Sequence, residues 1–196
     1  MATVEELRQE YLDSKIGSIA YLQSRIADAV ESPIEEMLVW GLLSIHDLEF
    51  YRALTFPSHV VLGGDSEVDA VFITSLGQRS APSCVLQPVV RVGEARYRID
   101  IALRLDAEAV DARVWLAIEC DGHEFHEKTK EQAQRDKRRD RDLQSIGWTV
   151  ARLTGAEIFR DPYAAAKSVY QLAQSVLDLR TKAIQAALGK PPNKDD

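Results

Sequence analysis

The sequence is poor in cysteine and in long apolar runs. Its two cysteines, Cys84 and Cys120, are too few for a disulfide framework in a chain of 196 residues, so we expect reduced thiols and a cytoplasmic location. No apolar run reaches the roughly 18 residues that a membrane-spanning helix needs. The first fifteen residues, MATVEELRQEYLDSK, are acidic and lack the apolar core of an export signal. These absences predict a protein that is neither exported nor membrane-bound.

The chain also lacks an overall excess of basic residues. Its net charge is −7, which argues against a protein that coats nucleic acid indiscriminately, because such binding depends on neutralising phosphates. A local basic patch is still compatible with an acidic body. Residues 135–141, RDKRRDR, hold five basic residues and two acidic ones. A solvated helix face and a phosphate-binding surface both explain this run.

A capping signature marks the start of a helix near residue 33. Ser32 is a preferred N-cap, Pro33 suits the first helical position, and Glu35 completes a capping box. We expect this helix to run to about Leu54, after a helix over residues 3–30 that Gly17 divides or weakens. Local rules alone therefore explain Glu35 as a cap.

Runs rich in β-branched residues predict strands in the middle of the chain. Gly93-Glu94 predicts a hairpin turn between two of these runs. The apolar run VWLAI is typical of a central strand that is buried on both faces. The predicted strands cover residues 58–62, 68–76, 84–92, 94–105, 113–121 and 148–153.

A charged helix is predicted between the last two strands, over residues 124–146. Leu143 and Ile146 are expected on its buried side, and Gly147 is expected as its C-cap. The strand–helix–strand unit predicts a parallel crossover within an otherwise antiparallel sheet. A final helix over residues 162–188 and a disordered tail over 189–196 complete the order.

Carboxylates interrupt two of the predicted strands. Asp100 and Glu119 stand where apolar residues are expected, and Asp121 has the same side-chain parity as Glu119. An unpaired buried charge costs several kcal/mol, so these acids need a function or a partner. Mg²⁺ or Mn²⁺ fits them, because hard cations take oxygen ligands and accept phosphate oxygens from a substrate.

Two histidines follow the second of these strands. His123 or His126 suits general acid–base chemistry, since imidazole titrates near neutrality. A zinc site made by Cys120, His123 and His126 is an alternative, although this spacing is too tight for a usual structural zinc loop. A pair of partly exposed loop histidines is a further alternative. Basic residues after the histidines supply donors for phosphate, namely Lys128, Lys130, Arg135, Arg138, Arg139 and Arg141.

Taken together, these motifs resemble the PD-(D/E)xK nuclease superfamily. Within it, the chain is most similar to the DUF559 and very-short-patch-repair (Vsr-like) endonuclease group. The resemblance covers residues 32–160 and rests on the order of SPIE, QPV, IDIA, LAIECDG with His126, and RDxxRDxxL running into GWxVxRL. It implies an α/β fold with a restriction-endonuclease-like core, a mixed central sheet flanked by helices, and extra N- and C-terminal helices. We therefore expect one nuclease-like domain over residues 1–188, with its core at about 32–160.

The resemblance also implies roles for individual residues. Asp100 and Glu119 fall at the metal ligands, Glu35 at a helix acid near the metal, and His126 at a catalytic histidine. Gln87 is expected near the site. Asp121 stands where the superfamily carries a lysine that positions the attacking water, with Lys128 or His123 as possible replacements. The residues expected to contact nucleic acid are Gln87, His123, Lys128, Lys130, Arg135, Arg138 and Arg139.

The sequence thus favours a metal-dependent endonuclease that hydrolyses DNA phosphodiester bonds. The alternative is a catalytically inactive nuclease fold that serves as a DNA-binding or protein-interaction module. A purely structural α/β protein leaves the strand carboxylates without an explanation. We expect Mg²⁺ or Mn²⁺ as the cofactor and DNA as the partner, with a homodimer or an accessory protein as further options.

Overall fold

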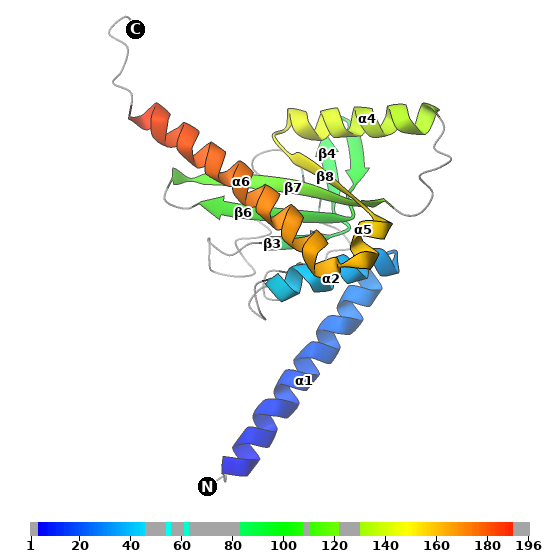
Figure 1. Ribbon diagram of the computed structural model, residues 1–196, viewed down its shortest axis with the longest axis vertical. Coiled ribbons are helices and arrows are strands. Elements are labelled where there is room, and N and C mark those ends of the chain that lie inside the picture. The colour runs from blue at the N-terminus through cyan, green and yellow to red at the C-terminus, as the bar shows by residue number, and fades with distance from the viewer. Residues whose placement is uncertain are drawn as a thin grey trace, which may run out of the picture.

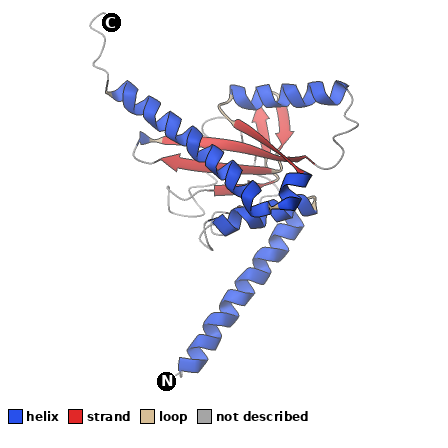
Figure 2. Ribbon diagram, in the orientation of Figure 1, coloured by secondary structure: helices blue, strands red, loops and turns tan. Residues whose placement is uncertain are grey.

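The computed structural model describes residues 4–45, 54–55, 61–62, 83–107, 110–121 and 130–189. These residues form an α/β fold in which helices flank a mixed sheet (Figure 2). The predicted fold class is therefore confirmed. The tail after Gly189 and the predicted strand over 68–76 lie outside the described residues.

The core sheet has five strands in the order β1-β3-β6-β7-β8. Strands β3 and β6 are antiparallel, as are β6 and β7, whereas β7 and β8 are parallel. The predicted parallel crossover through the charged helix is therefore correct. The strands of this sheet are β1 (Leu54–Thr55), β3 (Ser83–Leu86), β6 (Ile101–Ala107), β7 (Ala112–Asp121) and β8 (Thr149–Thr154).

A second, smaller sheet has three strands in the order β2-β4-β5. Its strands are β2 (Val61–Leu62), β4 (Val89–Val92) and β5 (Ala95–Arg98). One register continues from β3–β6 into β4–β5, because Leu86 faces Ile101 and Val89 faces Arg98. The predicted hairpin is thus present, with a bend between its two halves. Gln87 lies at this bend with φ +51°.

Helices cover both faces of the core sheet (Figure 1). Helices α2 (Pro33–Ile45) and α6 (Pro162–Leu188) pack on one face with α5 (Gly155–Arg160), and α4 (Lys130–Ser145) packs on the other. Helix α1 (Val4–Ala29) packs through Leu22 and Ile26 at its C-terminal end, and its N-terminal end projects away from the fold.

Several sequence-based expectations need correction. The first helix is continuous through Gly17. The second helix is described from Pro33 to Ile45, and Leu54, its predicted end, instead begins a strand. The predicted extension over 46–53 lies outside the described residues. Ile146 is 39% exposed, because α4 ends at Ser145 and the chain turns there. The sheets are less antiparallel than predicted, since β1–β3 and β2–β4 are parallel pairs in addition to β7–β8.

Candidate active site

Asp100 and Glu119 lie beside each other at one end of the core sheet. The β6–β7 ladder pairs Ile101 with Ile118, and the same register carried one residue further sets Asp100 opposite Glu119. Asp100 also accepts a hydrogen bond through Oδ2 from the backbone N–H of Cys120, at 2.8 Å. The two acids that the sequence singled out therefore share one site, as strands about 4.8 Å apart allow.

Glu35 reaches this site from the start of α2, and Gln87 links it to the hairpin. Glu35 is only 6% exposed. Its Oε1 accepts a hydrogen bond from Ser32 Oγ at 2.8 Å, and its Oε2 accepts one from Gln87 Nε2 at 2.6 Å. The backbone N–H of Gln87 donates to the Asp100 carbonyl at 2.9 Å. Glu35 is thus both a capping residue, as local rules predict, and a neighbour of the strand acids.

The charges of these acids influence one another. Burial, opposed by Arg139 and assisted by the charge of Asp100, raises the pKa of Glu119 to about 7. Burial is also the main reason why the pKa of Asp100 is raised, with the charge of Glu35 adding to it. Burial and the charges of Asp100, Glu35, Glu119 and Asp121 all raise the pKa of the Cys120 thiol. The charges of these acids therefore act on one another at this end of the sheet, and such repulsion favours the approach of a cation.

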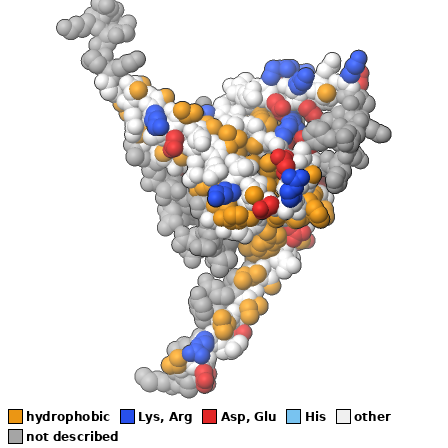
Figure 3. Space-filling view, viewed as in Figure 1, with side chains coloured by type: hydrophobic (Ala, Val, Ile, Leu, Met, Phe, Trp, Pro, Cys, Tyr) orange, Lys and Arg blue, Asp and Glu red, His pale blue; other side chains and the backbone are white. Residues whose placement is uncertain are grey.

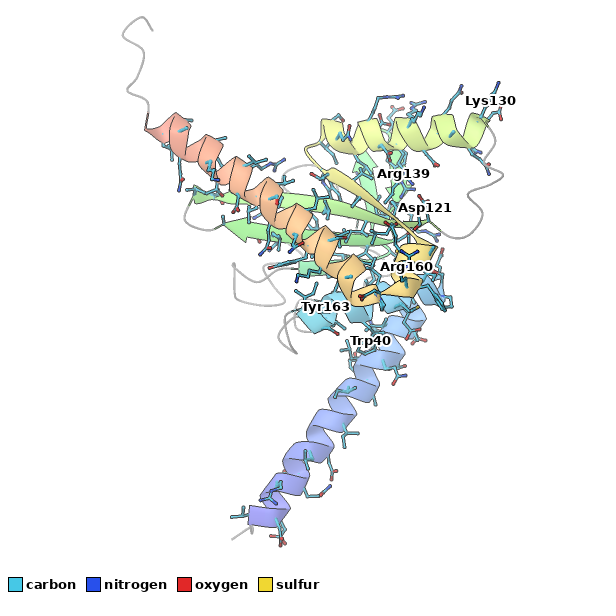
Figure 4. The ribbon with its side chains drawn as sticks, viewed as in Figure 1. Trp40, Asp121, Lys130, Arg139, Arg160 and Tyr163 are labelled. Carbon is cyan, nitrogen blue, oxygen red and sulfur yellow. The ribbon has the colours of Figure 1, made fainter. Side chains whose placement is uncertain are left out.

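Arg139 brings a positive charge into contact with Glu119. Its guanidinium forms an ion pair with Glu119 Oε1 and donates to the Arg98 carbonyl at 2.6 Å. The Arg139 side chain is 20% exposed and that of Glu119 is 7% exposed. We expected Arg139 on the phosphate-binding face of the helix, but its side chain points towards the sheet. Figure 4 shows Arg139 and Asp121 between α4 and α5.

Removing Arg139 should destabilise the metal-free protein. In EDTA, Arg139→Ala leaves the buried Glu119 carboxylate without its partner, which we expect to cost roughly 3 kcal/mol at pH 8. The pKa of Glu119 is higher in the folded state than in the unfolded state, so the folded protein binds a proton at Glu119 more readily. The loss should therefore be small near pH 5 and grow as the pH rises through 7. Denaturant unfolding at both pH values measures it.

Arg138→Ala is the matched control, because Arg138 precedes Arg139 on α4 but its side chain is 75% exposed and lies 3.8 Å from Asp142. It should change the free energy of unfolding little at either pH. Equal effects of the two substitutions at pH 8 would contradict the buried ion pair.

Asp121 belongs to a second ion-pair group beside the first. Arg152 on β8 lies 3.6 Å from Asp121 Oδ1 and donates to Asp140 Oδ1 at 2.8 Å. Asp140 on α4 is therefore paired with an arginine of the neighbouring strand. Arg152 also faces Glu119 in the β7–β8 register. Asp121 is thus a carboxylate that is compensated by an arginine.

The carboxylates fit a divalent cation in part. Among the described residues, no group of three or more His, Cys, Asp or Glu side chains is placed to hold a metal ion. Asp100 and Glu119 each keep one carboxylate oxygen that accepts no hydrogen bond from the described part of the chain. Two such oxygens suit Mg²⁺, which often binds one or two carboxylates and completes its shell with water and substrate phosphate. They do not make a closed cage for a structural metal.

The remaining predicted residues divide into two groups. Lys130, Arg135 and Arg138 are exposed on α4, and basic side chains gather over this helix in Figure 3. His123, His126 and Lys128 lie outside the described residues, so their roles and the zinc alternative stay predictions.

Sequence reasoning missed Arg152 and the inward orientation of Arg139. The inward orientation of Arg139 follows from its spacing, because it lies four residues before the buried Leu143 and so shares its helix face. The sequence indicates the position of Arg152 less directly, since Arg152 lies opposite Glu119 only through the β7–β8 register.

Comparison with known proteins agrees with this geometry. Residues 84–172 match the family model REase_MTES_1575, a restriction endonuclease-like family. The match runs from β3 into α6 and includes Gln87, Asp100, Glu119 and Arg139, whereas Glu35 precedes it. No curated protein and no solved structure matches the chain. No helix in the described ranges combines the length and apolar character needed to cross a membrane.

Proposed function

We propose that this protein is a metal-dependent endonuclease acting on DNA. In support, residues 84–172 match the model of a restriction endonuclease-like family, which favours the PD-(D/E)xK nuclease type. The observation that carries the proposal is the meeting of Asp100, Glu119 and Glu35 at one end of the sheet. These acids come from two strands and a distant helix, and their mutual repulsion has no evident structural benefit. A polyanionic substrate with a divalent cation gives them a purpose.

The proposed cofactor is Mg²⁺ or Mn²⁺, held by the free oxygens of Asp100 and Glu119. When bound, such an ion neutralises charge on the phosphodiester and lowers the pKa of a coordinated water. We propose that the backbone N–H of Cys120 fixes the orientation of Asp100 through its 2.8 Å hydrogen bond. Gln87 similarly holds Glu35 towards the acids. Both contacts would keep the carboxylates in place for a substrate.

In hydrolysis, a water oxygen attacks phosphorus, the bond to one sugar oxygen breaks, and that oxygen leaves with a proton. Arg139 is placed to act in this step, because guanidinium groups bind phosphate oxygens well. We propose that Arg139 exchanges Glu119 for the scissile phosphate when the cation binds. Asp121 and the two histidines are further candidates for proton transfer. The resemblance to the very-short-patch-repair group supports His126 for this role.

Plasmid cleavage tests the proposal directly. Purified protein at low micromolar concentration should nick or linearise supercoiled plasmid in 5 mM Mg²⁺ or Mn²⁺, and EDTA should stop the reaction. An RNA substrate tested in parallel separates a DNA nuclease from a general one. The proposal fails if neither nucleic acid is cut with either metal over a range of pH and salt concentration.

One observation favours a second candidate function, an inactive nuclease fold that binds DNA or a protein. Arg139 already provides a positive charge beside Glu119, where the proposed metal ion would bind. Asp121 also replaces the usual lysine. Such a protein would bind duplex DNA equally well in EDTA and in Mg²⁺ without cutting it.

A further inference from the structure

The hairpin formed by β4 and β5 carries a row of arginines that the proposed catalytic step does not use. Arg91 on β4 and Arg96 on β5 are exposed, as is Arg98 at the base of the hairpin. Residues two apart on a strand share a face and recur about every 7 Å. Arg96 and Arg98 therefore lie on one face, and the strand register adds Arg91 to it.

Arg91 and Arg96 face each other directly across the hairpin. Like charges at opposed positions of an antiparallel pair destabilise it. Within the described part of the chain, neither arginine has a hydrogen bond or an ion pair. Glu94 lies in the turn of the hairpin, and Glu31, just before α2, pairs with Arg98. The hairpin thus keeps two repelling cations together without compensation.

The opposite face of the hairpin fixes the direction of these arginines. Val90 and Ile99 are fully buried, and with Val92 and Tyr97 they belong to the cluster that includes Leu143 and Trp148. The Tyr97 hydroxyl also donates to Asp142 on α4. Because the face with Val90 and Tyr97 packs against α4, the arginine face points away from the body of the fold.

The arginine face leads to the candidate active site. Arg98 lies at the base of this face and pairs with Glu31, which comes just before α2. The Arg98 carbonyl also accepts a hydrogen bond from Arg139. One register continues from Arg98 to Asp100, which lies two residues further along the strand. A polyanion bound along the hairpin would therefore reach the carboxylates at its lower end.

We propose that the arginine face of the β4–β5 hairpin binds the phosphate backbone of the nucleic acid on one side of the cleaved bond. This inference rests on the proposed nuclease function and adds a contact surface separate from α4. Guanidinium groups suit this task, since they bind phosphate oxygens through paired donors. Contacts of this kind fix the position of the nucleic acid and carry no sequence information. Occupation by phosphate also removes the repulsion between Arg91 and Arg96.

The salt dependence of DNA binding tests this surface. The probe is a fluorescein-labelled 24-base-pair duplex, titrated with full-length protein in EDTA from 50 to 200 mM NaCl. Each lost phosphate contact lowers the slope of log K against log salt by about 0.9. Arg91→Ala/Arg96→Ala should therefore lower the slope by about 1.8. Wild type should lose about ten times more affinity than this variant over the same range.

Three variants make the test specific. Arg91→Glu creates an ion pair with Arg96 and should lower the slope as much as the double alanine variant. Arg91→Lys/Arg96→Lys keeps both charges and should keep the slope. Arg8→Ala/Lys182→Ala removes two exposed charges from α1 and α6 and should leave the slope unchanged. Arg91→Glu and Arg91→Ala/Arg96→Ala should melt no lower than wild type, because each relieves the repulsion between Arg91 and Arg96.

The possible results separate the two proposals. The hairpin surface is overturned if the slope is unchanged in Arg91→Ala/Arg96→Ala, or if it falls equally in Arg8→Ala/Lys182→Ala. Plasmid cleavage would still be a valid test of the proposed enzyme in either case. A slope that falls only in the hairpin variants supports the surface even if the plasmid stays uncut. Absence of duplex binding by wild type at 50 mM NaCl overturns the surface.

Discussion

Asp100→Asn and Glu119→Gln should each reduce plasmid cleavage by about 10³-fold or more. Each substitution removes a carboxylate oxygen from the proposed cation site, and stabilisation of transition-state charge by a metal supplies several kcal/mol. A loss of about 4 kcal/mol corresponds to this factor. Initial rates of supercoiled plasmid loss in Mg²⁺ measure the effect, with Mn²⁺ as a second metal.

The same two variants should stay folded. The pKa of both carboxyl groups is raised mainly by burial, so the folded state already favours their neutral forms. Asparagine has nearly the same shape as aspartate. In EDTA, Asp100→Asn should therefore melt at the wild-type temperature or higher. Glu119→Gln gives up the ion pair with Arg139 and should melt close to wild type below pH 6. Wild-type cleavage rates in both folded variants would show that chemistry occurs elsewhere.

Gly41→Ala should be the most damaging small substitution in the scaffold. Gly41 lies on α2, and a Cβ atom there would come within 2.3 Å of the Pro162 carbonyl oxygen and 3.0 Å of the Ala166 side chain. Backbone must move to accept it, and we expect a net loss of about 2 kcal/mol. For a chain of this length, that lowers the melting temperature by roughly 6 °C. Because α2 carries Glu35, a shift of the helix should also slow cleavage.

Gly17→Ala is the matched control for this prediction. Gly17 also lies within a helix, but nothing lies within 4 Å of a Cβ atom placed there. Alanine is favoured over glycine in a helix interior by about 1 kcal/mol, so this variant should be neutral or more stable. A melting temperature that rises in both variants would contradict the close packing of α2 on α6.

Local patterns predicted most of the fold. The hairpin turn at Gly93-Glu94 follows from turn chemistry, and Gly93 has φ +58°. Gly147 ends the charged helix with φ +80°, as a C-cap glycine should. The end of the second helix was not predictable in this way, because residues up to Leu54 are compatible with a helix and only pairing with Cys84 on β3 makes Leu54 a strand residue.

The site was predictable where one strand pair defines it. Asp100 and Glu119 stand out because acids interrupt apolar runs, and the register then brings them together. Glu35 was ambiguous, because its hydrogen bond with Ser32 satisfies a local rule while its contact with Gln87 spans 52 positions. The arginine face was missed because Arg91 and Arg96 become neighbours only through cross-strand pairing. Contacts between distant segments carry no local sequence signal.

A calorimetric titration of Mn²⁺ tests the central claim most directly. The claim is that Asp100 and Glu119 form a cation site at the end of the β6–β7 strand pair. Wild type should bind one Mn²⁺ per chain at millimolar or lower concentration and melt at a higher temperature with the metal present. Asp100→Asn and Glu119→Gln should lose this binding, whereas Arg139→Ala should bind Mn²⁺ more tightly because a competing cation has been removed. Equal Mn²⁺ binding by wild type and both carboxylate variants, or none by wild type, would contradict the account.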